Sequence, residues 1–301
     1  MKDIPEFRID RWIQAQIDKI KIPLQGSNIG AWSLSELQQL DPDEPILDYD
    51  LPLTYGTSAG SVKLRERIAA LYSSPENGVT LTADNIVVTP GSIMANYLAL
   101  TNLAGPGDHV ICLYPTFSQL FAVPRFQGAD VSLWRLRKRA DGSGWYADLD
   151  DLKALLRENT RVIIINNPNN PTGAVLPHST LAALLHITST THQHTTLYSD
   201  EVFHPLFHAP GSHPPSLLSL PTRTRTIVTG SLSKTLGLPG LRLGWIACND
   251  ATFLRARVMK ARDYTTISVA QLSDAAGCFA LGPRVMARIL ERSHEVRRRG
   301  C

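Results

Sequence analysis

The sequence predicts an α/β protein whose mainly parallel sheet is covered by helices on both faces. Short apolar runs, among them residues 86–89, 109–113 and 162–165, alternate with segments whose apolar residues recur at helical spacing. Unbroken apolar runs of this length are typical of strands buried on both faces. Turns rich in Gly, Ser, Asn and Pro follow several of these runs, and the carboxyl ends of parallel strands are where such sheets bind ligands. At 301 residues the chain can bury a core of this size, as one large domain or as a large and a small one.

Composition narrows the range of partners and compartments. The formal net charge is +3 and the basic residues are dispersed, apart from three arginines at 297–299, which we expect to end a helix. We therefore predict no nucleic-acid partner. The four cysteines have no paired spacing, which predicts free thiols in a reducing compartment: Cys112, Cys248, Cys278 and Cys301. The N-terminus lacks an apolar signal core and no apolar run is long enough to span a membrane, so we expect a cytoplasmic protein without a membrane partner.

Two helices are predicted at the start of the chain. A helical spacing of apolar side chains runs through residues 9–20, and this amphipathic helix packs either on its own domain or on a partner subunit. A second helical segment, residues 62–71, follows a Gly-containing loop that begins at Tyr55. The Tyr55 ring is either a packed loop aromatic or a group that binds a ligand.

Two predicted strands then lead into polar turns. Residues 86–89 precede Gly91 and Ser92, where free backbone N–H groups at a helix start and a hydroxyl can hold an anion. The alternative is a plain turn in which Ser92 caps the helix. Residues 109–113 precede a turn that contains Phe117, whose ring is either a flat apolar surface for a ligand or part of the core.

Three later turns carry the residues from which chemistry is expected. They are Asn-Pro-Asn-Asn-Pro-Thr-Gly at 167–173, Ser-Asp-Glu-Val-Phe at 199–203 and the Ser- and Gly-rich stretch 231–245. In the last of these, partial burial can keep the Lys234 amine neutral and nucleophilic, as imine chemistry requires, while hydroxyls and Arg242 hold an anion. The alternatives are an ordinary surface loop at 231–245, a structural cap in the second turn and turn formation alone in the first.

The order and spacing of these motifs resemble the class I/II aminotransferases, fold-type I enzymes that use pyridoxal 5′-phosphate (PLP). The resemblance extends from about Asn28 to the end of the chain. It implies the three-layer α/β/α large domain of that fold and PLP as the cofactor. It also implies that Lys234 forms a Schiff base with PLP and moves the substrate Cα proton, that Asp200 pairs with the pyridine nitrogen, and that Asn170 donates to the phenolic oxygen.

The resemblance also implies the remaining contacts of the cofactor and substrate. Phe117 would stack on the pyridine ring, and Gly30 together with Asn170 would lie near the substrate. The phosphate would be held by backbone groups, hydroxyls and a forked guanidinium, contributed by Gly91, Ser92, Ile93, Ser231, Ser233 and Arg242. Tyr55 would reach the phosphate of the neighbouring subunit in a homodimer.

The histidines do not predict a metal site. Their spacings match no compact ligand set and the chain has no paired cysteines: His192, His194, His204, His208 and His213. His204 and His208 follow Asp200 closely and could instead line the substrate pocket. We therefore expect no bound metal.

Two departures from the family pattern bear on function. Relatives usually carry tyrosine where this chain has Phe203, which cannot donate to the phenolic oxygen, so we expect a Schiff base that stays protonated to higher pH. The family's C-terminal small domain supplies an arginine for the substrate carboxylate, and this sequence ends at Cys301, inside the helix that leads there. The expected domains are an N-terminal arm with part of the small domain at 1–45, the PLP-binding domain at 46–275 and the start of the connecting helix at 276–301.

These features predict a PLP-dependent aminotransferase that acts on an amino acid and a 2-oxo acid. The stretch 199–208 also resembles capreomycidine synthase-like enzymes, so a PLP-dependent cyclase or lyase of a natural-product pathway is the alternative. A truncated, non-catalytic paralogue that keeps the cofactor site is a third interpretation, from a different functional class. The orientation of the bond broken at Cα decides among these reactions, and no motif reveals it.

Overall fold

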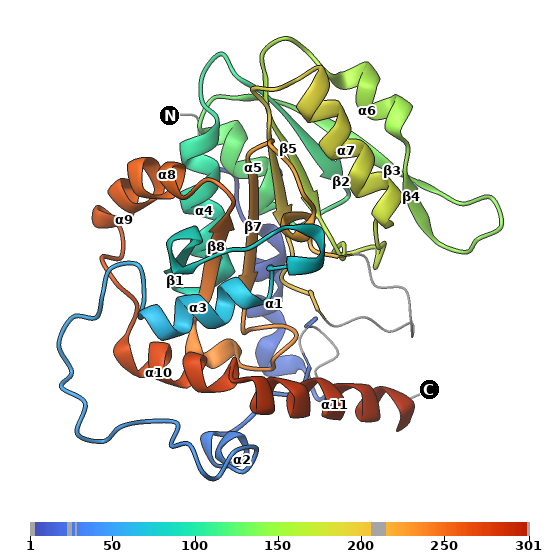
Figure 1. The fold of residues 1–301 in the computed structure, drawn as a ribbon. Helices are drawn as coiled ribbons and strands as arrows, with labels where there is room; N and C mark the ends of the chain where they lie inside the picture. The colour runs from blue at the N-terminus through green and yellow to red at the C-terminus, as the bar shows by residue number, and fades with distance from the viewer. Residues whose placement is uncertain (1–3, 23–25, 28, 206–214, 300–301) are drawn as a thin grey trace.

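A computed structural model describes residues 4–22, 26–27, 29–205 and 215–299, and its centre is an eight-stranded sheet (Figure 1). The strands lie in the order β1 (Ile86–Thr89), β8 (Gly244–Cys248), β7 (Thr226–Ser231), β6 (Thr196–Asp200), β5 (Thr160–Asn166), β2 (His109–Tyr114), β3 (Asp130–Lys138) and β4 (Trp145–Ala147). The five from β7 to β3 pair in parallel, whereas β8 and β4 run antiparallel to their neighbours. The predicted mainly parallel sheet is confirmed.

The strands send alternate side chains into two cores, one on each face of the sheet. In β2, Ile111 and Leu113 join one core, whereas Val110 and Cys112 join the other. Six α-helices contribute buried residues to the first core: α2 (Leu34–Gln38), α3 (Val62–Ala70), α6 (Leu149–Leu155), α7 (His178–Thr190), α10 (Gln271–Ala280) and α11 (Pro283–Arg299). The second core is covered by α4 (Gly91–Leu103), α5 (Gln119–Phe126), α8 (Ala251–Phe253) and the π-helical η6 (Leu254–Met259). The expected three-layer α/β/α arrangement is thereby confirmed (Figure 1).

The remaining elements are short or lie at the ends of the chain. They are α1 (Arg8–Gln16), η1 (Ile17–Lys19), η2 (Pro75–Asn77), η3 (Ala83–Asn85), η4 (Leu217–Ser219), η5 (Pro239–Leu241) and α9 (Lys260–Asp263). The predicted first helix corresponds to α1 together with η1. No residue of α1 is buried. The arginines at 297–299 end α11, as expected.

The terminal helix α11 holds the N-terminal segment 32–41 through three arginines spaced one helical turn apart. Arg284 Nη1 donates to Asp41 Oδ1 at 2.7 Å and Arg288 Nη1 donates to the Leu40 carbonyl at 2.6 Å. The Arg292 guanidinium lies 4.0 Å from the centroid of the Trp32 ring. Segments from opposite ends of the chain are therefore packed together beside the sheet.

The structure bears on the predictions about the cysteines and about membrane-spanning segments. Cys112, Cys248 and Cys278 are buried free thiols, as predicted, and Cys301 lies outside the described residues. Within the described ranges, no helix combines the length and apolarity needed to cross a membrane.

Candidate active site

The three predicted motifs open at one edge of the sheet. Asn166 at the end of β5 is in register with Asp200 at the end of β6, and Asp200 is in register with Thr229 of β7. Ser231, the last residue of β7, pairs with Gly244, the first residue of β8. Since β5, β6 and β7 are parallel, the turns that follow them share the carboxyl edge, where such sheets bind ligands.

Lys234 lies half-buried in the turn after β7. The turn is closed by hydrogen bonds from Leu238 N to the Leu232 carbonyl at 3.0 Å and from Leu232 N to the Leu243 carbonyl at 3.1 Å. Burial lowers the pKa of the Lys234 amine below its ordinary value; the negative charge of Asp200 opposes this shift and the positive charge of Arg242 adds to it. A lowered pKa raises the fraction of neutral, nucleophilic amine, which the sequence analysis expected of this lysine.

The N-terminal segment around Gly30 lies against this lysine turn. Ile29 N donates to the Lys234 carbonyl at 3.3 Å, and Trp32 N donates to the Gly237 carbonyl at 3.2 Å. A Cβ on Gly237 would lie only 2.7 Å from the Gly30 carbonyl oxygen, and Gly237 has a φ of +65°, so glycine is required there. Gly30 is thus next to Lys234, and the space where its own Cβ would be is open.

Asp200 is buried, with donors on both carboxylate oxygens. Oδ2 accepts from Asn96 Nδ2 at 2.9 Å, and Oδ1 accepts from Val202 N at 3.2 Å. Burial raises the pKa of Asp200 to about 6, against the effect of these two hydrogen bonds, which lower it. The bond from Val202 N is a local cap of the kind considered from sequence. The bond from Asn96 comes from a different element, α4, and is therefore not a local cap.

The Asn-rich turn after β5 combines turn formation with a link to Asp200. Asn166 Nδ2 donates to the Asp200 carbonyl at 2.9 Å, and Asn166 Oδ1 accepts from Asn170 N at 2.6 Å. Asn169 Oδ1 accepts from the Thr172 hydroxyl at 2.7 Å, which closes the turn. Asn170 is held half-buried beside β6 by these bonds, and the Asn169 Nδ2 atom is buried without a hydrogen-bond partner among the residues that the structure describes.

Groups that favour an anion lie together where α4 begins. Gly91 has a φ of +77°, and a Cβ there would lie 2.6 Å from Arg242 Nη2, so the guanidinium is packed directly on the glycine backbone. A Cβ on Gly244 would lie 2.5 Å from Ser92 N. The N-cap of α4 is Pro90, which provides no side-chain cap, so the alternative in which Ser92 caps the helix is wrong. The first N–H groups of a helix and a guanidinium together favour an anion such as a phosphate.

The other residues predicted to contact the cofactor range from buried to exposed. Ser231 and Ser233 are buried beside Lys234, and Ser233 N donates to Ser231 Oγ at 3.3 Å. Phe117 is half-buried, with its ring centroid 5.4 Å from that of Phe7 near the N-terminus. Ile93 in the first turn of α4 is 44% exposed.

Tyr55 is the predicted site residue that this chain leaves most open. Its side chain is 80% exposed, so it is not a packed loop aromatic. Gln271 Nε2 fixes its loop by donating to the carbonyls of Pro52 at 2.9 Å and Thr54 at 2.7 Å. The ring therefore projects from an ordered loop and is available to another subunit.

A polar network that no sequence motif indicates lies behind Asp200. Asn96 of α4, Gln119 of α5, Tyr198 of β6 and Thr229 of β7 are all buried there. A polar residue within the apolar, buried face of helix 91–103 was a signal that could have identified Asn96.

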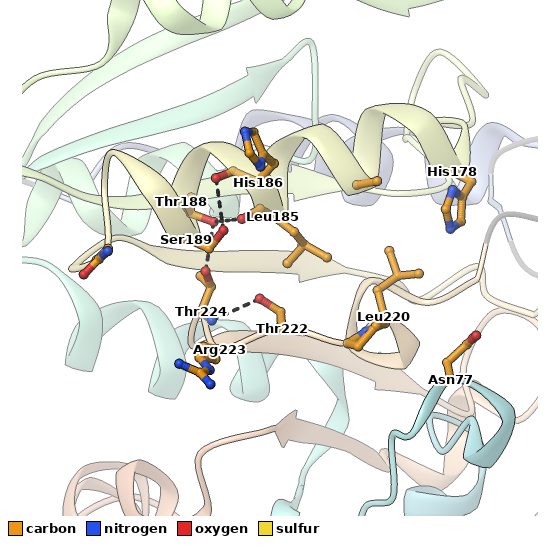
Figure 2. A pocket seen from close by; sticks show the side chains of 13 residues that line it. Asn77, His178, Leu185, His186, Thr188, Ser189, Leu220, Thr222, Arg223 and Thr224 are labelled. Atoms are coloured by element: carbon orange, nitrogen blue, oxygen red, sulfur yellow. Dashed lines mark hydrogen bonds between the residues drawn. The ribbon is translucent and has the colours of Figure 1, made fainter.

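His204 lies beside the lysine turn, where its carbonyl accepts from the Thr235 hydroxyl at 3.5 Å. Within the described ranges, no group of His, Cys, Asp or Glu has a metal-binding arrangement, and His208 and His213 lie outside them. A cavity of about 830 Å³ lies between α7 and the segment leading into β7, lined by His178, His186 and Arg223 among others (Figure 2). It is at the amino ends of β6 and β7, the edge opposite Lys234, and its lining includes none of the predicted site residues.

Comparison with known proteins gives consistent matches. The family model described as aminotransferase class I and II matches residues 35–297. Capreomycidine synthase from Streptomyces vinaceus is 31% identical over 98% of this chain and 73% of its own length. Tyrosine aminotransferase from Mus musculus is 31% identical over 65% of this chain and 41% of its own length. The chain therefore spans less than half of some curated relatives and about three quarters of others.

Solved structures show the same relationship. A PLP-dependent aminotransferase from Streptococcus suis 89-1591 superposes with a TM-score of 0.85 at 34% identity, covering 97% of this chain and 74% of that one. The PLP-dependent cyclase OrfR superposes with a TM-score of 0.80 at 25% identity, covering 98% of this chain and 72% of that one.

Proposed function

Because the chain belongs to the aminotransferase class I and II family, we propose that it transfers an amino group between an amino acid and a 2-oxo acid, with Lys234 as the residue that binds PLP covalently. PLP is the cofactor that family membership and the structural matches imply. The observation that carries the proposal is the convergence of charge around one lysine. The Lys234 amine interacts electrostatically with both the buried Asp200 and Arg242.

The residues at the carboxyl edge fit PLP at three points. Its phosphate suits the start of α4, where the Arg242 guanidinium lies against Gly91 with no room for a side chain between them. Its pyridine nitrogen suits Asp200, a buried carboxylate whose hydrogen-bond donors favour the charged form. Its aldehyde suits the half-buried Lys234 amine, whose pKa is lowered. Asn170, Ser231 and Ser233 complete the proposed site.

Different side chains of this chain have different roles in the proposed reaction. When bound, PLP supplies an electron sink for the negative charge that develops at the substrate Cα. Lys234 Nζ accepts the Cα proton and returns it, because its lowered pKa leaves the amine free to act as a base. Asp200, held ionised by its donors, keeps a positive charge on the ring nitrogen. Phe117 provides a flat apolar face that orients the ring and excludes water.

We propose that two copies of the chain form a homodimer. Large apolar side chains are exposed on two adjoining segments, with Tyr49 96%, Leu53 77%, Tyr55 80%, Tyr264 93% and Ile267 50% exposed. Exposed apolar surface of this kind favours association. In the dimer Tyr55 contacts the phosphate in the neighbouring subunit, and α1, with Ile9 and Trp12 exposed, packs on that subunit.

We also propose a division of the chain into domains. Residues 46–275 form the PLP-binding domain and residues 1–45 contribute the N-terminal arm and part of a small domain, whereas the expected connecting segment 276–301 is not one helix, because α10 ends at Ala280 and α11 begins at Pro283. The arginine contacts of α11 with segment 32–41 support a joint role for the two ends of the chain. The buried free thiols support a reducing compartment such as the cytoplasm.

A second candidate reaction is PLP-dependent cyclisation or elimination. It is favoured by the match to capreomycidine synthase, which extends over 98% of this chain, and by the superposition with the cyclase OrfR. Both reactions begin with loss of the same Cα proton, so the roles of Lys234 and Asp200 are unchanged. The third candidate, a paralogue that binds PLP without turnover, has the same cofactor site.

The absorption spectrum of the purified protein with PLP separates these candidates. We expect a visible band above 400 nm that Lys234→Ala lacks, and conversion of this band to the pyridoxamine form by at least one amino acid. Conversion of substrate without accumulation of that form favours cyclisation or elimination. A band that no amino acid alters supports the non-catalytic paralogue, and absence of any band contradicts the proposed cofactor site.

A further inference from the structure

We propose that Asn96 of α4 is a positioning residue that keeps the Asp200 carboxylate ionised and correctly aimed, through a buried hydrogen-bond network whose direction is set by Tyr198 and Thr229. The inference rests on the proposed role of Asp200 and extends it to a part of the chain that makes no direct contact with the substrate. It concerns three elements that are distant in sequence, namely α4, β6 and β7.

The network is buried completely. Asn96 is 1% exposed, and Tyr198 and Thr229 are 0% exposed. The Tyr198 hydroxyl lies 2.6 Å from Asn96 Oδ1, and the Thr229 hydroxyl lies 2.7 Å from the same atom. A separation of 3.2 Å between the two hydroxyls is longer than either contact, so the strongest bonds of both hydroxyls converge on one atom.

This convergence fixes the orientation of the Asn96 amide. A carboxamide oxygen has two lone pairs and can accept from both hydroxyls at once, so the NH₂ group is directed to the other side. There Nδ2 donates to Asp200 Oδ2 at 2.9 Å. The reversed amide would bring its oxygen against the carboxylate oxygen, and two acceptors at that distance are compatible only if Asp200 is protonated. The amide orientation and the charge of Asp200 are therefore coupled.

Gln119 fixes the remaining proton of the amide. Gln119 Nε2 donates to the Ile93 carbonyl at 2.7 Å, which directs Gln119 Oε1 toward Asn96 Nδ2 at 3.2 Å. Both donor positions and both acceptor positions of Asn96 are thus used. Because Ile93 is in the first turn of α4, the network also connects Asp200 to the start of the helix where the proposed phosphate site lies.

Burial and hydrogen bonding act on Asp200 in opposite directions. Burial disfavours the charged carboxylate and is the largest effect on its pKa, and the hydrogen bond from Asn96 is the largest effect that opposes it. Removing the Asn96 donor therefore leaves burial dominant, and Asp200 becomes neutral over a wider pH range. A neutral Asp200 cannot hold a positive charge on the ring nitrogen of PLP.

The test measures the titration of Asp200 in the protein without PLP, by ¹³C NMR of labelled aspartate carboxyls, with Asp200→Asn to assign the signal. In Asn96→Leu, which keeps a similar volume without a donor, we expect the midpoint to rise by at least one pH unit. In Thr229→Val, which removes one of the two hydroxyls that orient the amide, we expect a smaller rise. The equilibrium dissociation constant of PLP is measured in parallel from pH 6 to 9.

Affinity for PLP should fall about tenfold in Asn96→Leu near neutral pH and recover as the pH rises past the new midpoint, because one unit of pKa corresponds to a factor of ten. A merely structural role would lower thermal stability without moving the midpoint. An unchanged midpoint in Asn96→Leu overturns the inference, and if that variant does not fold, an unchanged midpoint in Thr229→Val overturns it alone. If the unaltered protein does not bind PLP, the proposed function fails while the midpoints still decide the role of Asn96.

Discussion

Asp200 and Glu201 are consecutive acids, each 2% exposed, which the sheet directs to opposite faces and into different surroundings. Asp200 accepts from Asn96 and Val202, one donor for each oxygen. Glu201 Oε1 accepts from Leu217 N at 3.0 Å, and the hydroxyls of Ser216 and Ser199 also lower the pKa of Glu201, whereas Glu201 Oε2 has no hydrogen bond of good geometry among the described residues. Burial raises the pKa of Asp200 to about 6 and that of Glu201 to about 7.

Both acids are equally buried and both accept hydrogen bonds, so we infer that their positions on the sheet separate the two roles. A side-chain network holds Asp200 in its charged form at the carboxyl edge, where a cationic ring nitrogen would need it. Glu201 faces the core of α3, α7 and α10 and fixes the start of η4 through Leu217. We therefore interpret Asp200 as functional and Glu201 as structural, and variants of these two residues test that distinction.

The largest expected effect is on turnover. Asp200→Asn should lower kcat for transamination by about two to three orders of magnitude, because a neutral amide cannot hold the ring-nitrogen charge. Glu201→Gln is the matched control, since it makes the same acid-to-amide change one residue away and should stay within about threefold of the unaltered protein. Equal losses of kcat in the two variants would remove the distinction between the two faces.

A smaller effect is expected on the stability of the protein without PLP. Because burial raises the folded-state pKa of Glu201 from 4.5 to about 7, its favourable contribution is complete below pH 4.5 and is lost as the pH rises through about 7. Glu201→Gln should therefore unfold at higher denaturant concentration than the unaltered protein at pH 8, by of the order of 1–3 kcal/mol. Chemical unfolding at pH 5 and pH 8 measures this, and a stability difference that is the same at both pH values contradicts it.

The smallest expected effect concerns Phe203, half-buried two residues after Glu201. Tyrosine at this position would donate a hydrogen bond to the phenolic oxygen of PLP. Phe203→Tyr should therefore lower the pH midpoint of the visible PLP band, by about one unit or less. A spectral titration that coincides with that of the unaltered protein would show that Phe203 does not face the cofactor.

The sequence predicted well those features that short stretches of chain determine. The buried strands β1 and β5 appear as unbroken apolar runs, and the turns after β5, β6 and β7 do lie at one edge. The antiparallel direction of β8 was not predicted, because an apolar run such as 244–248 gives the position of a strand but not its direction in the sheet.

The network around Asn96 was not predictable from local patterns, because it joins residues that are far apart along the chain. Its bonds to Tyr198, Asp200 and Thr229 join residues separated by 102, 104 and 133 positions. The contact of Arg242 with Gly91 likewise depends on how β8 and α4 meet, and not on the residues that flank either one. Local motifs identified the groups that carry charge, and tertiary packing determined which of them are held ionised.

The most direct test of the account is to locate the lysine that binds PLP. The protein is incubated with PLP and reduced with borohydride, which fixes a pyridoxyl group on any lysine in covalent linkage, and the peptides are analysed by mass spectrometry. We predict modification at Lys234 alone, and none in Lys234→Ala. Modification absent from Lys234, or no greater there than at an exposed lysine such as Lys63, whose side chain is 63% exposed, would contradict the assignment of this edge of the sheet as the active site.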